Sequence, residues 1–288
     1  MITIMGATGS AGGALLRRLT ELGIPCRAVS RTPDTLRAAM GGETRVEVVG
    51  ADAADPRALR AAFEGSSQLF LAMANSPRQV ALEINAIDAA AACGVQHVVK
   101  LSSPAVGPDS PVVISRGHWR IEAHLAATGM VATLLRPYGF MQNLLLNAPA
   151  VAEGVLIGAM RDVPCNYIDV RDIGDVAAEA LLRPGLRGAT YTLTGPQAFS
   201  HPELAALLTA RTGRPVRHID LTPDDFHGHL VRTAHMPDWL ANHVVEIQQL
   251  AIACPESPDG TVETVLGRPA RTLDAFVREH LAVFAPVA

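Results

Sequence analysis

Short apolar runs alternate with segments of helical periodicity over the first half of the chain. Leu15, Leu16, Leu19 and Leu22 recur at the spacing of a helix that packs on a sheet. The apolar runs themselves are nearly continuous, which is typical of parallel strands covered on both faces. They lie at residues 2–5, 26–30, 46–49, 68–72, 97–101 and 131–136. This alternation predicts an α/β protein with a doubly wound parallel sheet of the Rossmann type.

The alternation fades after Pro137, and the later elements are less regular. The pattern predicts a helix at 173–182, a strand at 191–194, a helix at 201–212 and a strand near 216–220. We therefore expect a Rossmann domain over residues 1–150, to which a strand and a helix return from about 165–195. A smaller α/β lobe over residues 196–288 is expected to bind the substrate, in a cleft at the carboxyl ends of the strands.

The composition and net charge indicate which kinds of binding partner the protein is suited to. The chain has 288 residues, 49% of them hydrophobic, and a formal net charge of −4. This balance offers no basic field for nucleic acid or a membrane surface and favours a small-molecule substrate. The chain begins without the pattern of an export signal, so a cytoplasmic location is expected.

The cysteines and histidines suggest no metal or disulfide site. Cys26, Cys93, Cys165 and Cys254 are far apart and form no C-x-x-C pair, so buried free thiols are expected. The 227–229 His-Gly-His segment lacks helical spacing and a complete set of partner ligands. No metal site is predicted.

A glycine-rich loop follows the first predicted strand and opens the first helix. Gly6, Gly9 and Gly12 have the spacing G-x-x-G-x-x-G. Gly6 permits a tight turn, Gly9 lets the backbone approach a pyrophosphate, and Gly12 allows close packing of helix on strand. The loop predicts a dinucleotide-binding site.

Arg31 comes directly after the second predicted strand, where the choice between the two nicotinamide dinucleotides is usually made. An acid at this place binds a ribose hydroxyl, whereas a guanidinium can bind the 2′-phosphate of NADP(H) in a bidentate manner. NADP(H) is therefore favoured as the cofactor. The alternative is that Arg31 is a solvated charge that pairs with Asp34.

Two further residues fall at the carboxyl ends of strands. Asp52, after the third strand, is placed to meet the adenine edge, although it is equally suited to forming a turn. Met73, after the fourth strand, is expected to line the dinucleotide groove.

Together with the loop and Arg31, three segments resemble the NmrA-like proteins, which are atypical members of the short-chain dehydrogenase/reductase superfamily. They are the Lys-Leu-Ser-Ser segment at 100–103, the His118-x-x-x-Glu122 pair and the segment 135–143. The likeness looks closest to the NADPH-dependent quinone reductases and the triphenylmethane-dye reductases. The family also includes NADP-binding regulators that catalyse no reaction.

The resemblance implies roles for individual residues. The residues implied to bind the cofactor are Gly6, Thr8, Gly9, Ser10, Ala11, Gly12, Arg31, Asp52, Met73 and Lys100. Tyr138, Phe140 and Asn143 are implied to line the nicotinamide and substrate pocket. Ser102 is expected to bond an oxygen of the cofactor or substrate.

The sequence lacks the Tyr-x-x-x-Lys pair of ordinary alcohol dehydrogenation. No tyrosine has a lysine four residues further on, since Lys100 is the one lysine. His118 and Glu122 share a helical face, so the carboxylate is expected to orient the imidazole as a proton donor, with a structural pair as the alternative. Tyr138 is the second candidate catalytic residue.

Hydride transfer to a quinone or another conjugated acceptor needs little more than positioning, because the acceptor is already electrophilic. We therefore expect an NADPH-dependent reductase of an apolar, conjugated compound. One alternative is a non-catalytic NADP(H) sensor that acts on a protein partner. The other is an isomerase or dehydratase of a secondary metabolite. A homodimer is compatible with each.

Overall fold

The computed structural model describes residues 1–284, which form two compact units. The first unit comprises residues 1–109, 114–137 and 170–192. The second comprises residues 110–113 and 138–169 and the chain from 193 onward. The division thus falls at Pro137 and not at 150, because the chain after Pro137 pairs with a strand of the second unit.

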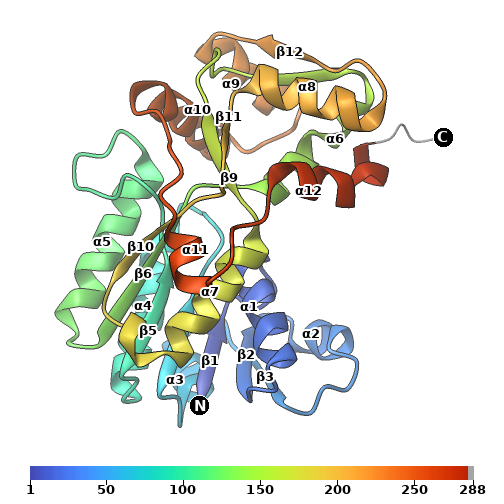
Figure 1. Cartoon of the computed structure of the whole chain (residues 1–288). Coiled ribbons are helices and arrows are strands. Elements are labelled where there is room, and N and C mark those ends of the chain that lie inside the picture. Colours follow the sequence, from blue (N-terminus) through green and yellow to red (C-terminus); the bar gives the residue numbers. More distant parts are fainter. Residues whose placement is uncertain (285–288) are drawn as a thin grey trace. The chain divides into compact units, whose positions relative to one another are not determined.

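A seven-stranded sheet forms the centre of the first unit, with the order β10-β6-β5-β4-β1-β2-β3 (Figure 1). Six of these strands pair in parallel, in the order β6-β5-β4-β1-β2-β3, and β10 lies at the edge of the sheet beside β6. The strand order reverses between β1 and β4, which is the switch point of a Rossmann-type fold. The strands are β1 (Ile2–Met5), β2 (Cys26–Ser30), β3 (Val46–Gly50), β4 (Gln68–Leu71), β5 (His97–Leu101), β6 (Val131–Pro137) and β10 (Thr190–Leu193).

Helices cover both faces of this sheet. Apolar residues of α3, α4 and α5, among them Phe63, Ile87 and Ile121, pack in one core cluster with strand residues such as Leu71. Helix α7 (yellow in Figure 1) packs along α1, and a Cβ on Gly174 would lie only 2.7 Å from the backbone of Ala14. The helices are α1 (Ser10–Glu21), α2 (Pro33–Ala39), α3 (Pro56–Phe63), α4 (Gln79–Ala92), α5 (Val113–Ala127) and α7 (Val170–Leu182), with a short 3-10 helix η2 (Pro184–Leu186).

The second unit contains two small sheets, with the orders β11-β9-β7 and β12-β8. Its core gathers apolar residues of η1, α6, α8 and α12. The strands are β7 (Gly139–Phe140), β8 (Val155–Gly158), β9 (Cys165–Ile168), β11 (Ala198–Phe199) and β12 (Arg217–Asp220). The helices are η1 (Met141–Asn147), α6 (Ala148–Ala152), α8 (His201–Thr212), α9 (Pro223–Arg232), α10 (Asp238–Ala253), α11 (Thr261–Leu266), α12 (Leu273–Glu279) and η3 (Leu281–Phe284).

The apolar pattern placed the regular elements well. All six strands of the first half are confirmed, within one residue at each end, and so is the helix at 201–212. The strand predicted at 191–194 is β10, which belongs to the central sheet. The pattern did not predict β7, β8, β9 or β11, which lie after Pro137, where the alternation of apolar runs fades.

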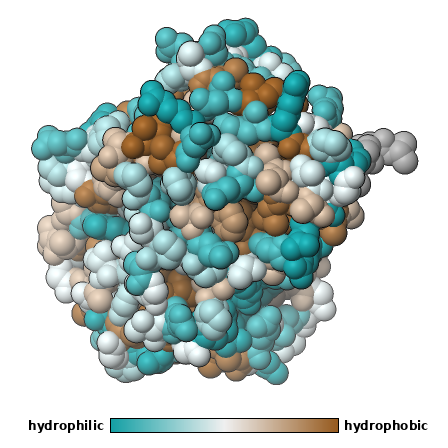
Figure 2. Space-filling model, turned by 45° about the horizontal axis from the view of Figure 1, so that its top comes forward, coloured by the Kyte–Doolittle hydropathy of each residue, from teal (hydrophilic) through white to brown (hydrophobic). Residues whose placement is uncertain are grey.

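The surface is mixed in character. On the face drawn in Figure 2, hydrophobic residues form small groups that hydrophilic residues separate. None of the helices formed by residues 1–284 is both long enough and apolar enough to cross a bilayer. The four cysteines are free thiols.

Candidate functional site

The glycine loop joins β1 to α1 in a conformation that only glycine permits. Gly6 has a φ of +90°, and a Cβ there would lie 2.0 Å from the carbonyl oxygen of Ala72. A Cβ on Gly12 would lie 2.2 Å from the carbonyl oxygen of Gly6. The loop is therefore folded tightly against the carboxyl ends of β1 and β4, as the spacing of the glycines predicted.

The first turn of α1 has amide groups that no side chain caps. Gly9 is the N-cap residue, and its N–H donates to the carbonyl of Gly6 at 2.9 Å. The amides of the next residues have no carbonyl a turn earlier to bond, because the helix begins at Ser10. Thr8, Gly9 and Ser10 are exposed, whereas Ala11 is buried. The exposed part of this turn suits an anionic group such as a pyrophosphate.

Arg31 is exposed directly after the end of β2. Within residues 1–284 its guanidinium makes no hydrogen bond or ion pair. Asp34, its alternative partner, instead pairs with Arg37 at 2.6 Å. Ser30 Oγ accepts the N–H of Thr32 at 3.0 Å, which fixes the turn before α2. The arginine is thus held on an ordered turn with its charge available.

The next two predicted cofactor residues differ in their surroundings. Asp52 is exposed, and its Oδ1 accepts the N–H of Ala54 at 2.8 Å, which is the contact of a turn former. Met73 is half-buried and packs against the core cluster of the first unit.

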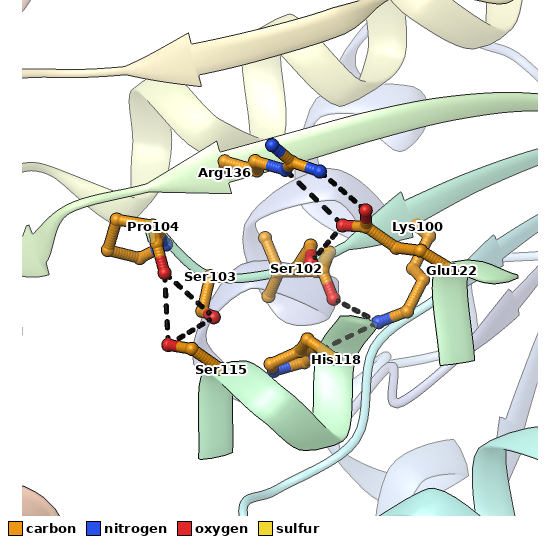
Figure 3. Close-up of polar contacts among 9 residues, drawn as sticks. Lys100, Ser102, Ser103, Pro104, Ser115, His118, Glu122 and Arg136 are labelled. Carbon is orange, nitrogen blue, oxygen red and sulfur yellow. Dashed lines mark hydrogen bonds and ion pairs between the residues drawn. The ribbon is translucent and has the colours of Figure 1, made fainter. Parts of the chain in front are cut away.

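Lys100 lies inside the first unit and not on its surface. The side chain is fully buried, and Nζ forms an ion pair of 2.9 Å with Glu83 Oε2. Nζ also donates to the carbonyl oxygen of Leu101 at 3.0 Å and to His118 Nδ1 at 2.9 Å (Figure 3). Glu83 Oε2 has no hydrogen-bond partner among the described residues, so this contact is an ion pair, and two of the three ammonium protons are used in hydrogen bonds. Because Nζ is fully buried, direct contact with a dinucleotide would require these side chains to move.

His118 is 4% exposed and sits on α5, facing the end of β5. Because Lys100 donates to Nδ1, a neutral imidazole there carries its proton on Nε2. Gln79 Nε2 lies 3.5 Å from His118 Nε2 and donates to Glu83 Oε1 at 2.8 Å. Gln79, Glu83, Lys100 and His118 therefore form one buried polar cluster.

Glu122 does not take the role that its helical spacing suggested. Ser102 Oγ donates to Glu122 Oε1 at 2.5 Å, and Arg136 Nη2 lies 2.5 Å from Oε2 (Figure 3). The carboxylate thus joins α5 to the ends of β5 and β6, while His118 pairs with Lys100. The expectation that Glu122 orients His118 was wrong, because the nearest complementary groups come from the sheet and not from the helix. Ser102 is 7% exposed and uses its proton in this contact.

The neighbouring serine belongs to a separate, smaller contact. Ser103 Oγ donates to Ser115 Oγ at 3.1 Å, and Ser115 donates to the carbonyl oxygen of Pro104 at 3.0 Å (Figure 3). These bonds hold the turn after β5 against the first turns of α5. They position the segment that carries Ser102.

Tyr138, Phe140 and Asn143 belong to the second unit. The Tyr138 N–H donates to the carbonyl of Leu193 at 3.1 Å, and Phe140 is the last residue of β7, beside Ile168 of β9. Tyr138 and Phe140 are half-buried, and Asn143 is exposed. Burial raises the pKa of the Tyr138 phenol, and the negative charges of Glu256, Asp259 and Cys254 raise it further.

Sequence reasoning missed Glu83, Arg136 and Glu256. Glu83 could have been suspected, because the one lysine of the chain lies within a buried strand and needs a counter-ion. Glu256 lies in an irregular segment, and no local pattern points to it. Among residues 1–284, no cluster of three or more His, Cys, Asp or Glu side chains could hold a metal ion.

The strand order and the glycine loop define a dinucleotide-binding protein of the Rossmann class. The chain belongs to the NmrA-like family, whose model matches residues 1–274. It is 36% identical over 288 residues to an NAD(P)H azoreductase from Xenophilus azovorans, a match that covers 99% of both chains.

Two further relatives match nearly the whole chain. The (4-alkanoyl-5-oxo-2,5-dihydrofuran-3-yl)methyl phosphate reductase of Streptomyces griseus is 35% identical over 292 residues, with 99% of this chain and 100% of the relative covered. The NADPH-dependent quinone oxidoreductase QOR2 of Escherichia coli, solved as a complex with NADPH, has a TM-score of 0.88 at 30% identity. That match covers 98% of this chain and 100% of the other.

Proposed function

We propose that the protein is an NADPH-dependent reductase that transfers a hydride to a quinone-like or otherwise conjugated small molecule. The observation that carries this proposal is the near-complete match, at 36% and 35% identity, to two reductases. Their names and that of the quinone oxidoreductase specify azo, dihydrofuranone and quinone compounds. All three are electrophilic conjugated systems, which accept a hydride without strong polarisation of a carbonyl group.

The glycine loop and Arg31 fit NADPH. Gly6 and Gly12 keep the loop compact, because a Cβ at either position would collide with backbone atoms. The first turn of α1 has no side-chain cap, so its amide groups can bind the pyrophosphate. Arg31, whose charge no described residue neutralises, meets the 2′-phosphate. Asp52 and Met73 border the adenosine side. Bound NADPH supplies the hydride.

The buried cluster around Lys100 fixes the positions of the strand ends that border this site. Its ammonium group and the Glu83 carboxylate neutralise each other, and the ion pair ties α4 to the end of β5. Glu122 ties α5 to β5 and β6 in the same way. Lys100, Ser102 and His118 thus act through the position of the strand ends, and any contact of theirs with cofactor or substrate needs a rearrangement of these bonds.

Tyr138, Phe140 and Asn143 line the substrate pocket in this proposal. Two half-buried aromatic residues offer an apolar surface to a planar acceptor, and the Tyr138 hydroxyl and the Asn143 amide offer hydrogen bonds. Hydride transfer to such an acceptor depends chiefly on its position relative to the nicotinamide.

The test is NADPH oxidation, followed at 340 nm, with an azo dye, a quinone and an enone. Binding of NADPH is measured first by titration. Tight binding together with acceptor-dependent oxidation is expected. Tight binding of both NADP forms with no oxidation by any of the acceptors contradicts the reductase and favours an NADP(H) sensor.

A further inference from the structure

The segment between α10 and α11 carries Glu256 and is fixed at two places. Glu256 Oε2 accepts the backbone N–H of Asn166, in β9, at 2.6 Å. Three residues further on, the Asp259 N–H donates to Thr194 Oγ1 at 3.2 Å, and Asp259 Oδ1 accepts from that hydroxyl. Pro255 precedes Glu256 and restricts the backbone there. The carboxyl group is therefore held in one position.

Tyr138 lies close to this segment, because Gly139, the next residue, pairs with Tyr167, and Tyr167 directly follows Asn166, whose N–H binds Glu256. The backbone of Tyr138 bonds Leu193, the residue before Thr194, which anchors Asp259. The pKa of its phenol is raised by burial and then by the charges of Glu256 and Asp259, with a smaller effect of Cys254. The phenol therefore stays protonated at neutral pH and acts as a hydrogen-bond donor, unlike a tyrosine beside a lysine.

Both groups retain an atom for a ligand. Within the described residues 1–284, Tyr138 Oη takes part in no hydrogen bond. Glu256 Oε1 accepts none either, although Oε2 of the same carboxylate is bound to Asn166. Both side chains are half-buried, so they are reachable and yet partly shielded from water.

The environment of Glu256 gives its carboxyl group the properties of a proton donor. Burial raises the pKa of Glu256 to about 7, and the Asn166 N–H bond opposes this only in part. The Cys165 thiol and the Tyr167 phenol also lie near, but the pKa of Cys165 is raised to about 12 and that of Tyr167 well above its usual value, so both are neutral at pH 7. Neither of these two exchanges a proton near pH 7.

We propose that Glu256 is the acid that delivers the proton accompanying hydride transfer, while the Tyr138 hydroxyl donates a hydrogen bond to the acceptor. This inference rests on the proposed reductase function. With an azo acceptor, a hydride from NADPH forms an N–H bond at one nitrogen, and the N=N π bond breaks. The electron pair left on the second nitrogen takes the proton of Glu256. The azo compound is reduced to a hydrazine, NADPH is oxidised to NADP⁺, and the carboxylate regains a proton from water.

The experiment compares two kinds of acceptor. A cationic triphenylmethane dye such as malachite green takes up a hydride at its central carbon and becomes neutral, so its reduction needs no proton. An azo dye needs one proton for each hydride. The variant Glu256→Gln keeps the size of the side chain and an oxygen for the Asn166 N–H, but it removes the acid. Glu263→Gln, at an exposed glutamate of α11, is the matched control.

A general acid typically accelerates a reaction by about 10²- to 10⁴-fold. We expect Glu256→Gln to lower kcat for the azo dye by about 100-fold or more at pH 6, and to leave kcat for the cationic dye within about twofold. In the wild-type protein, azo reduction should decline as the pH rises through about 7, and the variant should lose this decline. Glu263→Gln should match the wild type with both dyes.

Two results overturn the inference while the reductase stands. Equal loss with both dyes makes Glu256 a structural residue, and an unchanged azo rate and pH profile exclude it as the acid. If the cationic dye is not an acceptor of the wild type, the pH profile of azo reduction alone decides between these outcomes. Binding of NADPH without oxidation by any acceptor removes the reductase function itself, which is a different result.

Discussion

Lys100 Nζ lies 2.9 Å from Glu83 Oε2, and both side chains are fully buried. The lysine is the penultimate residue of β5, the glutamate lies on α4, and neither side chain is reached by water. A buried ion pair of this kind is retained only if its remaining hydrogen-bonding groups are satisfied. His118 and the Leu101 carbonyl satisfy those of Lys100, and Gln79 donates to the other oxygen of Glu83.

Removal of one member of this pair should cost more than removal of both. Lys100→Met leaves the Glu83 carboxylate buried without its counter-ion, and we expect a loss of about 3 kcal/mol in the free energy of unfolding. Lys100→Met combined with Glu83→Met should be less destabilising than the single change. Urea unfolding of the wild type, both single variants and the double variant gives the coupling. Additive losses would show that the two charges do not depend on each other.

Arg31 should decide between the two nicotinamide dinucleotides. A charge-assisted hydrogen bond to phosphate contributes about 1.5–3 kcal/mol, so Arg31→Glu should weaken NADPH binding by about 100-fold. NADH lacks the 2′-phosphate, and its dissociation constant should change by less than about fivefold. Fluorescence titration measures both. Arg60→Glu, at an exposed arginine of α3, is the control. A similar loss of affinity for both cofactors would remove Arg31 as the selector.

Two adjacent glycines of α1 should respond differently to a methyl group. In Gly12→Ala the new Cβ meets the Gly6 carbonyl oxygen at 2.2 Å, so the loop must shift, and NADPH affinity should fall at least about tenfold. In Gly13→Ala the nearest atom is the Ala7 carbonyl oxygen at 3.4 Å, an ordinary contact. That change should keep NADPH affinity within about twofold and raise stability by up to about 1 kcal/mol. Comparable affinities of the two variants would contradict the packing argument.

Buried histidines should make the fold sensitive to acid. Burial, with a further effect of Arg187, lowers the pKa of His97 to about 4, and burial also lowers that of His201 to about 4. Their usual value is 6.5, so the unfolded chain takes up a proton first as the pH falls. Stability should therefore be lost between pH 6.5 and 4, by up to about 1.4 kcal/mol per pH unit for each histidine.

His97→Asn tests this pH dependence, because asparagine does not titrate. His97 bonds Gln68 and Thr133, so the variant should be less stable at pH 7. Between pH 6.5 and 4 its free energy of unfolding should decline less steeply than that of the wild type. Urea midpoints measured at several pH values give both slopes, and identical slopes would show that His97 does not contribute.

The sequence predicted the central sheet because each strand is a local apolar run between recognisable turns. The pattern at 26–30 or 97–101 depends only on neighbouring residues. The second unit lacks such a pattern. Its strands β7 and β11 are two residues long and pair with β9, so their existence depends on contacts remote in sequence.

The contacts of two side chains of α5 likewise depend on residues remote in sequence. The spacing of His118 and Glu122 correctly placed both on one helix. It could not show that Lys100 donates to the imidazole and that Arg136 pairs with the carboxylate. These partners project from β5 and β6, and the register of two parallel strands against a helix is not encoded in the spacing along the helix.

Local sequence patterns are enough to predict the Rossmann class of fold, the glycine loop and the place of Arg31 after the second strand. These features follow from local rules, since backbone conformation and apolar periodicity act over a few residues. The packing of the elements sets which charges neutralise each other, which polar groups remain without a partner and where Glu256 lies in relation to Tyr138. Burial, distance and pKa arise from groups far apart in the chain, so they exist only once the elements have packed.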